Sequence, residues 1–597
     1  MTCKTGSRLI TSASLLAMLA GLNPALAVPP AALDRVPDNA PVVVALRSMQ
    51  AATEKVNKFS ESMGIPRPEG DNPIAMAQKM LGTPGLNAGG SMAVAIVPGP
   101  DGKVIMGEDA GDKTTGVVIV PVSDYAAFVK AMGAEKSDGV TSVNIDGKPG
   151  FIKDLQGGFA AITVVPGLLD KFDGAAGKGP KHAAMLGKNG GGIADTADVL
   201  IIANVAHLQD QLKDGRTRMK DQMEQATMML GDQAAGIGGS LALLDTVMGT
   251  FAKDATCGVL GLTLNESGIT ADLGTQFKEG TEPAGFFSST GNAGGLIARI
   301  PNLPFYFAGA IDTSSPGLRQ IFKNIAKAQT PQAGDGASPM SFLANIDKLG
   351  GFSGILGASP NALSGGGLFV NTSTFVATSD PAGYTALLAE QIKAANGRKE
   401  GPVTTKSTYK AGAAEVSGIK VDSWSMTMDI DQNDPTAMQA QMMSSMLFGM
   451  GEFGGMNAPV DGGVVSTYSM NTPLLTSAIE AAKTGTGLAS ASDIKEAASR
   501  LPADRSLELH IGVKPLMDAA LGLAAMFGGG PDVTLPEKIS PISIGASTTN
   551  GGMVLRVVLP MDTMKAFGDI AKQMNEGGDD DMDDPAPAQD GGKPPRF

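Results

Sequence analysis

Short hydrophobic runs recur along the chain, and most are followed at once by a stretch whose apolar residues repeat with helical spacing. In several cases a proline stands at the junction. Proline lacks an amide hydrogen, so it ends strand pairing and fits the first turn of a helix. The pattern therefore predicts strand–proline–helix units, capped by Ser123, Asp124, Ser379, Asp380 and Asp562. The units are VVIVP ending at Pro121, ITVVP at Pro166, FVATSDP at Pro381, VVSTYSMNTP at Pro473 and LRVVLP at Pro560.

Pairs of alternating runs joined by turn residues predict β-hairpins. GLTLNESGITADLG turns at 265–268, and SIGASTTNGGMVLRVVL turns at Asn550-Gly551, a dipeptide typical of two-residue hairpin turns. TSVNIDGKPGFIKD and AEVSGIKVDSWSMTMD have the same alternation. Hairpin strands pair antiparallel, so we expect an α+β fold of mostly antiparallel sheet with helices packed on one face.

A further motif occurs three times: arginine, a branched apolar residue and proline, followed by a few turn residues, a strand-like run and a helix. It begins at Arg35 before PVVVAL, at Arg299 before FYFAGAI and at Arg500 before LELHI. Internal repetition of this kind constrains the architecture of a chain more than any single motif.

The units follow one another in the same order twice. Each series begins with an Arg-x-Pro strand and helix, continues with strand–proline–helix units, and ends with a strand, a long helix and a hairpin. We therefore expect two tandem duplicated α+β modules, at 28–287 and 294–576. Arg35 and Arg299 mark equivalent starts, whereas Arg500 marks a later strand of the second module.

The two ends of the chain differ from the rest. Residues 1–27 have the pattern of a signal peptide: Lys4 and Arg8, a short apolar run, and the cleavage motif Ala25-Leu26-Ala27. This predicts export to the periplasm or the extracellular space. Residues 577–597 are rich in aspartate and proline, which predicts a disordered acidic tail. The glycine-rich stretches 186–192, 329–337 and 449–463 are expected to be surface loops or linkers.

The charge and cysteine content narrow the possible partners. The formal net charge is −14, which disfavours nucleic acid and anionic membrane surfaces as partners. After signal removal no apolar run is long enough to be an integral membrane segment. Cys257 would then be the only cysteine, so no intramolecular disulfide can form. It opens the run CGVLGLTL, and we expect it to be buried in a strand.

One set of motifs resembles those of the penicillin-binding serine enzymes. They are Ser407-x-x-Lys410, Ser469-Met470-Asn471 and Lys483-Thr484-Gly485. That chemistry needs the serine and the lysine on adjacent turns of a helix. The segment around them has strand alternation instead, which would turn Ser407 and Lys410 to opposite faces.

Other candidate sites depart from their patterns as well. Asp429, Asp431 and Asn433 begin like a calcium loop, but Asp434 replaces the glycine and Ala440 the final glutamate. Asp434-Pro435 is more typical of a helix start. The spacing Gly449–Gly454 matches a dinucleotide fingerprint but follows a helix. The three histidines, His182, His207 and His510, are too scattered along the chain to predict a metal site. A methionine-rich helix either fills core or interface space or binds Cu(I). Its methionines are Met438, Met442, Met443, Met446 and Met450.

The opening LDRVPDNAPVVVALRSM and units such as GGFAAITVVPGLLDKF resemble a domain-of-unknown-function family of exported bacterial envelope proteins, whose repeats open "LPADTPVVV". The resemblance implies an exported, two-part α+β protein and assigns no catalytic residue. With no convergent set of ionisable residues, we expect a non-catalytic cell-envelope binding or scaffold module for an apolar ligand or an envelope protein, without a cofactor. Two alternatives stay open: an enzyme whose site forms only in the fold, such as a serine hydrolase, and a calcium- or copper-binding protein.

Overall fold

The computed structural model describes residues 29–63, 73–99, 115–134, 139–145, 148–170, 181–230, 248–329, 346–359, 366–449, 453–526 and 533–576. The expected signal peptide (1–27) and acidic tail (577–597) lie outside these residues. The chain divides into two compact units: unit 1 comprises Met1–Thr53 and Glu69–Ile202, and unit 2 comprises Glu54–Pro68 and Ala203–Phe597. Both contain helices and antiparallel strands, so the predicted α+β class is confirmed.

Unit 1 contains an antiparallel sheet in the order β4-β5-β6-β3-β2-β1, and β1 pairs in addition with β7. Helix α2 and strand β7 begin in unit 1 and continue into unit 2. The elements are η1 (Ala31–Arg35), β1 (Val42–Leu46), α2 (Met49–Met63), α3 (Pro73–Met80), β2 (Met92–Ile96), β3 (Gly116–Pro121), α4 (Tyr125–Ala131), β4 (Val140–Ile145), β5 (Lys148–Gln156), β6 (Phe159–Thr163), α5 (Lys181–Met185), α6 (Gly187–Ala194) and β7 (Val199–Asn204).

Unit 2 contains the longer sheet. Its elements are η3 (Val205–His207), α7 (Gln209–Leu230), β8 (Ala255–Asn265), β9 (Gly268–Phe277), α9 (Glu282–Phe286), α10 (Ala293–Ile297), β10 (Phe305–Asp312), α11 (Pro316–Gln329), β11 (Leu349–Gly357), β12 (Thr372–Thr378), α12 (Pro381–Ala394), β13 (Lys399–Glu400), β14 (Val403–Val416), β15 (Ile419–Ile430), α13 (Ala437–Phe448), β16 (Phe453–Val460), β17 (Gly463–Thr467), α14 (Thr472–Thr484), η8 (Leu488–Ser490), α15 (Ser492–Arg500), β18 (Arg505–Ile511), α16 (Val513–Met526), β19 (Ile542–Thr549), β20 (Gly552–Pro560) and α17 (Met561–Glu576).

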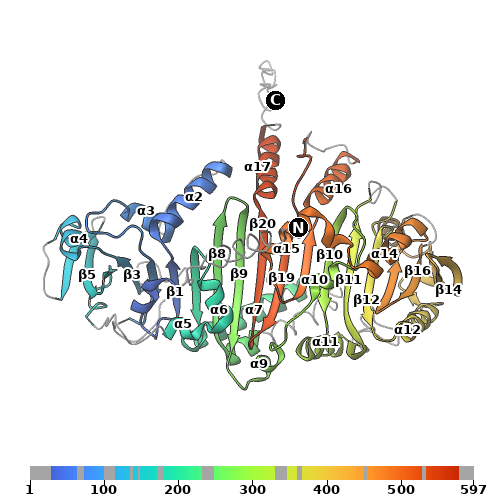
Figure 1. Ribbon diagram of the computed structural model, residues 1–597, viewed down its shortest axis with the longest axis horizontal. Coiled ribbons are helices and arrows are strands. Elements are labelled where there is room, and N and C mark those ends of the chain that lie inside the picture. The colour runs from blue at the N-terminus through green and yellow to red at the C-terminus, as the bar shows by residue number, and fades with distance from the viewer. Residues whose placement is uncertain are drawn as a thin grey trace, which may run out of the picture. The chain divides into compact units, whose positions relative to one another are not determined.

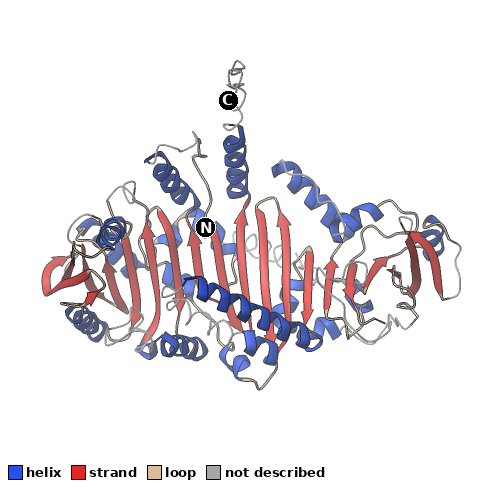
Figure 2. Ribbon diagram, turned by 180° about the vertical axis from the view of Figure 1, so that it is seen from behind, coloured by secondary structure: helices blue, strands red, loops and turns tan. Residues whose placement is uncertain are grey.

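The strands of unit 2 pair antiparallel in the order β8-β9-β20-β19-β18-β10-β11-β12-β17-β16-β15-β14-β13. Figure 1 views this sheet from the side that carries α14 and α15. Figure 2 views it from behind, where α7 crosses the strands. We call the side of α10, α14 and α15 the core face, and the opposite side the open face.

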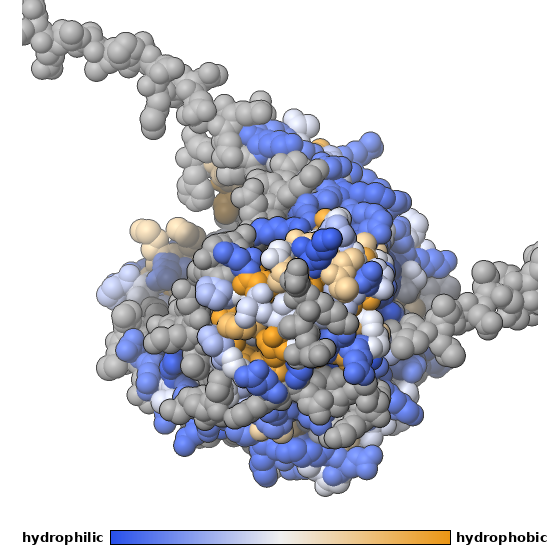
Figure 3. All heavy atoms as spheres, turned by 90° about the vertical axis from the view of Figure 1, so that its left-hand side faces the viewer, coloured by the Kyte–Doolittle hydropathy of each residue, from blue (hydrophilic) through white to orange (hydrophobic). Residues whose placement is uncertain are grey.

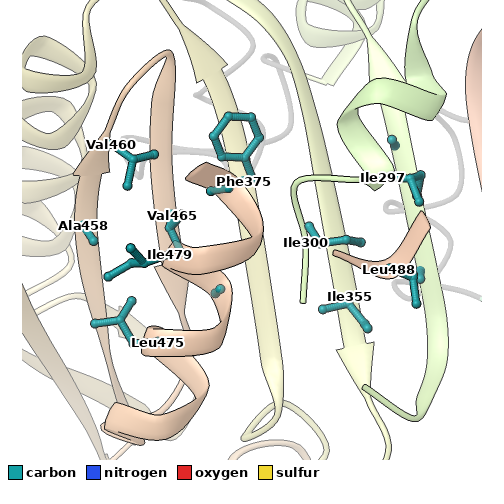
Figure 4. Close-up of a cluster of buried hydrophobic side chains, with 14 of the residues drawn as sticks. Ile297, Ile300, Ile355, Phe375, Ala458, Val460, Val465, Leu475, Ile479 and Leu488 are labelled. Atoms are coloured by element: carbon teal, nitrogen blue, oxygen red, sulfur yellow. The ribbon is translucent and has the colours of Figure 1, made fainter. Parts of the chain in front are cut away.

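The core face packs its small and branched side chains against three helices. One row of paired residues crosses five strands, and its members are Ala310, Ser353, Phe375, Val465 and Ala458. Ile297 of α10, Leu475 and Ile479 of α14 and Ile494 of α15 pack on this side of the sheet (Figure 4). Each buried branched or aromatic side chain contributes about 1.5–3 kcal/mol, so this cluster holds the sheet to its helices.

The predicted hairpin turn and helix caps form at the residues that favour them. The β19–β20 turn places Asn550 at φ 54° and Gly551 at φ 72°, the left-handed conformation that a two-residue hairpin turn requires. Asp124 caps α4 by accepting from the amide of Ala127 at 3.0 Å, and Asp380 caps α12 by accepting from Gly383 at 2.9 Å. The predicted hairpins β8–β9 and β19–β20 are therefore confirmed.

The three Arg-x-Pro motifs share a structural role. Each arginine donates to a backbone carbonyl that is distant in sequence: Arg35 to Leu155, Arg299 to Ala482 and Arg500 to Ser267. The branched residue that follows each arginine is buried. The repeated motif therefore ties the start of a strand to another part of its unit.

Three local predictions are wrong. The glycine-rich stretch 186–192 forms most of α6. Leu186 and Ile193 are buried on the same side of this helix, two turns apart, and their packing overrides the low helix propensity of glycine. Part of 449–463 is strand β16, where a side chain at Gly455 would collide with the ring of Trp424. Pro166–Asp170 is a turn rather than a helix start. Most of the stretch 329–337 lies outside the described residues.

Candidate functional site

One hollow of unit 2 lies on the open face, where β18, β10, β11 and β12 run side by side. Successive side chains of a strand point to opposite faces. Ala308 and Ala310 belong to the core, so Phe307, Gly309 and Ile311 belong to the open face. The same alternation places Phe352, Gly354, Thr374, Val376, Leu507 and Leu509 on the open face.

Two glycines form the floor of the hollow. Gly309 pairs with Gly354 across β10 and β11, Leu509 pairs with Gly309 on one side, and Thr374 pairs with Gly354 on the other. Two neighbouring positions therefore carry no side chain, and the sheet surface dips between them. A Cβ on Gly309 would lie 3.3 Å from Cδ1 of Leu509, and one on Gly354 would lie 3.3 Å from Cγ2 of Thr374. These close neighbours show that both flanking side chains lean over the glycines.

The walls of the hollow are mostly apolar. Ile311, Phe352 and Val376 form one side, and Tyr384 of α12 and Tyr468, which follows β17, border it from above the sheet. The cavity volume is about 550 Å³. Small-molecule sites of proteins are typically apolar hollows of about 300–1,000 Å³ with a few polar groups. The hollow therefore has the size and lining of a site for an apolar ligand.

An aromatic cluster adjoins this hollow in a chain that has only 5% aromatic residues. Trp424, the single tryptophan, lies edge-on to Tyr468 with ring centroids 5.9 Å apart, and edge-on to Phe453 at 5.2 Å. Phe448 of α13 contacts Phe453 at 4.4 Å and Phe369 at 5.7 Å. The cluster fixes Tyr468 in place, and it puts the only indole of the chain one ring away from the hollow.

The two tyrosines supply neutral hydroxyl groups. Burial and, to a smaller extent, the neighbouring Tyr468 raise the pKa of Tyr384 to about 12. Burial also raises the pKa of Tyr468, although a hydrogen bond with Thr374 opposes the shift. Both phenols stay protonated at neutral pH and can donate a hydrogen bond. The hollow can therefore orient a carbonyl or ester oxygen on an otherwise apolar molecule.

A buried polar network lies on the core face of β18 and β19. The hydroxyl of Ser543 lies 2.7 Å from Nδ1 of His510, and Nε2 of His510 lies 2.9 Å from Oε1 of Glu508. Arg505 donates to Oε2 of Glu508 at 2.6 Å. A carboxylate only accepts hydrogen bonds, so Nε2 of His510 carries a proton.

This network contains the same three kinds of group as a serine-hydrolase triad, but it is sealed. The side chains of His510 and Glu508 are 0% and 1% exposed, and Ser543 is 0% exposed. Burial alone raises the pKa of Glu508, yet hydrogen bonds from His510 and Arg505 outweigh it and hold that pKa below its ordinary value. A hydroxyl without access to substrate cannot act as a nucleophile. The hydrogen bond between His510 of β18 and Ser543 of β19 instead joins these two strands.

The structure separates the residues of the serine-enzyme motif. Ser407 and Lys410 lie on strand β14, as the alternation predicted, and the Ser407 hydroxyl donates to the carbonyl of Ile392. Lys483 lies in the last turn of α14 and donates to the carbonyl of Ser417, ten residues from Ser407 along the hairpin. Ten strand residues span about 33 Å, so these groups do not form one site.

In the calcium-like segment the acidic side chains contact neighbouring protein groups. Asp429 forms an ion pair with Lys406 at 2.8 Å, and Asp431 accepts from the amide of Asn433. Asp434 accepts from Thr436, and α13 begins only at Ala437, so the expected helix start at Asp434-Pro435 is wrong. Within the described part of the chain, no three His, Cys, Asp or Glu side chains come together in a metal-binding group.

The remaining candidates are dispersed. His182 is buried against the carbonyl of Pro37, and His207 is exposed. Gly449 ends α13, and β16 begins at Phe453, so the glycine spacing there precedes a strand rather than a helix. The methionines of α13 do not fill the core, because four of them are solvent-exposed: Met438 (78%), Met442 (69%), Met443 (51%) and Met446 (41%). The alternatives of interface packing and Cu(I) binding stay predictions. Met450 lies outside the described residues.

Sequence reasoning missed the hollow. A usable signal was present in FYFAGAI and GGFSGILG, since glycine inside a strand often marks the close approach of another group. Tyr384 and Tyr468 gave no such signal, because each comes from the segment that follows a different strand. Cys257 is buried, as predicted, and burial raises the pKa of its thiol to about 11.

Unit 1 presents a different surface. Figure 3 shows hydrophobic side chains gathered near the centre of the face that it views, with hydrophilic side chains around them. Val164, which follows β6, is 47% exposed. This face carries an apolar patch, whereas the open face of unit 2 has a cavity with Tyr384 and Tyr468 in its lining.

Comparison with known proteins adds little. No protein-family model and no curated protein matches this chain. Among solved structures, crystal form IV of TP0453 is similar at 12% identity, covering 42% of this chain and 81% of that one with a TM-score of 0.20, too low to support any argument. Among the described residues, no helix is both long enough and apolar enough to cross a membrane.

Proposed function

We propose that this chain is an exported, non-catalytic protein of the cell envelope that binds an apolar ligand, such as an acyl chain, in the hollow of the open face. The observation that carries the proposal is the pairing of Gly309 with Gly354, which opens a cavity of about 550 Å³ between apolar side chains. Tyr384 and Tyr468 line the same cavity, and their phenols stay protonated at neutral pH.

The lining of this hollow favours ligand binding over catalysis. Apolar walls stabilise an alkyl or aromatic group by about 25 cal/mol per Å² removed from water. Catalysis needs a nucleophile, an acid or a base close to the bound molecule. The hydroxyls of the two tyrosines stay protonated, and the Ser543–His510–Glu508 network faces the other side of the sheet.

Export and duplication belong to the same proposal. The N-terminal pattern at 1–27 supports export, and the resemblance to envelope proteins supports that location. The order of strand pairing supports two related modules: β6-β3-β2-β1-β7 of the first has the same succession as β17-β12-β11-β10-β18 of the second. In this proposal the modules at 28–287 and 294–576 descend from one ancestral unit.

Native mass spectrometry of protein purified from its own envelope fraction tests the function. The proposal predicts a mass excess that disappears on denaturation, together with an organic-soluble molecule released in equal amount. A single peak at the mass of the chain, with nothing extracted by organic solvent, would contradict ligand binding. The Gly354→Val variant serves as the matched sample, because its added side chain fills the floor of the hollow.

A further inference from the structure

Unit 2 contains a second cleft, lined by the part of α2 that belongs to this unit, the end of β8 and the first turns of α17. Its volume is about 510 Å³. Lys55, Lys58, Phe59 and Ser62 come from α2, Leu264, Asn265 and Glu266 from β8 and its turn, and Met561 and Lys565 from α17. The cleft is separate from the glycine-floored hollow, because the two have no lining residue in common within the described part of the chain.

Direct contacts hold the walls of this cleft together. The hydroxyl of Ser62 lies 3.7 Å from the sulfur of Met561, and the amide of Met561 donates to the carbonyl of Ser267 at 3.1 Å. The end of α2 also packs on α17, because Cε of Met63 is 3.9 Å from where a Cβ on Gly568 would lie. The cleft is therefore a defined feature of the fold.

The lining divides into an apolar floor and a cationic rim. Phe59, Leu264 and Met561 are half-buried, whereas the side chains of Lys58 and Lys565 are exposed. Lys55 and Lys58 are three residues apart on a helix, which places them on the same side of it. Among the lining residues that the structure describes, three lysines stand against one carboxylate, Glu266, in a chain whose formal net charge is −14. Positive charge is therefore concentrated beside an apolar surface.

We propose that this cleft binds a single-chain anionic amphiphile, with the alkyl chain on Phe59, Leu264 and Met561 and the anionic head on Lys58 and Lys565. Charge complementarity selects the head group, because an ammonium beside a low-dielectric surface attracts an anion more strongly than one surrounded by water. A fatty-acid carboxylate and a phosphate monoester present the same chemistry to these lysines. The site extends the binding role to a second ligand class and does not depend on the hollow.

Isothermal titration calorimetry with laurate and with dodecyl phosphate tests the site in the full-length exported chain. We expect the Lys58→Met/Lys565→Met double variant to bind laurate with a Kd about tenfold higher. Its affinity should also no longer decrease steeply with added salt. Methionine keeps the apolar stem of each lysine. Lys572→Met, on the same helix but outside the cleft, is the matched control and should bind like the natural sequence. Lys58→Arg/Lys565→Arg should retain binding, which separates loss of charge from loss of structure.

The alkyl chain could also enter the hollow, so the titration is repeated with Gly354→Val. The lysine-dependent step should persist in that variant. Laurate tighter than dodecyl phosphate indicates a carboxylate head, and the reverse indicates a phosphate head; either result supports the site. Equal affinity for uncharged dodecanol, or unchanged binding in the double methionine variant, would overturn it.

Discussion

Replacing Glu508 with glutamine tests the role of the buried network. Glu508 accepts hydrogen bonds from Arg505 at 2.6 Å and from His510 at 2.9 Å, and its side chain is 1% exposed. The amide keeps the shape but removes the charge, so the Arg505 guanidinium loses its ion-pair partner. Removing one member of a buried ion pair typically costs about 3–5 kcal/mol. Arg505 retains 12% exposure and a hydrogen bond to Pro502, so we expect the lower end, about 3 kcal/mol.

Urea unfolding followed by Trp424 fluorescence measures this cost, because Trp424 lies in the same unit as the network. The pH dependence supplies a second test. The pKa of Glu508 is lowered in the folded state, so its stabilisation is present above the ordinary glutamate range and disappears as pH falls through the folded value. The difference between the natural sequence and Glu508→Gln should therefore be constant near neutral pH and shrink below about pH 4.5.

Asp429→Asn provides the matched control, since it makes the same carboxylate-to-amide change in an ion pair with Lys406 that is more than half exposed. We expect no shift in its urea midpoint, because exposed ion pairs contribute little. If Glu508→Gln were as stable as Asp429→Asn at neutral pH, the network would not hold β18 to β19, and the reasoning would be refuted.

Three further results follow from the packing. Cys257 should resist iodoacetamide in the native protein at pH 8 and react once urea unfolds it, because burial raises the pKa of its thiol to about 11; rapid native labelling would show that the strand is accessible. Gly551→Ala should lower the free energy of unfolding by about 1 kcal/mol because φ is 72° there, whereas Gly522→Ala in α16, with open space around it, should raise it by about 0.5–1 kcal/mol; equal effects would contradict the backbone argument. Dilute peroxide should convert Met438 and Met442 to sulfoxides before the fully buried Met49 and Met92, as peptide mass spectrometry can show; the opposite order would mean that α13 is covered.

Strand–helix junctions and hairpin turns were predictable from short stretches of sequence, because neighbouring residues determine them. Pro121 and Pro560 stand at strand–helix junctions, and Asn550-Gly551 adopts the positive φ values of a hairpin turn. These features depend on neighbouring residues alone. Pro166 departs from the pattern, because the residues that follow it form a turn.

The hollow depends on the pairing of strands far apart in the chain, which local sequence patterns do not reveal. Gly309 and Gly354 are 45 residues apart, and only the register of β10 with β11 places them side by side. The same holds for Ser543, which meets His510 through the pairing of β18 with β19. By contrast, Glu508 and His510 are two residues apart in a strand, so their shared face was predictable from the alternation.

Energy transfer from Trp424 to a neutral fluorescent probe tests the central claim most directly. Trp424 contacts Tyr468, which lines the hollow, so N-phenyl-1-naphthylamine bound there should quench the tryptophan and emit by transfer. Gly354→Val should weaken this binding by about tenfold or more because it fills the floor. Gly350→Val, on the same strand but exposed and at an ordinary contact distance from Ala377, should bind the probe as the natural sequence does. Equal transfer in all three proteins would contradict ligand binding in the hollow.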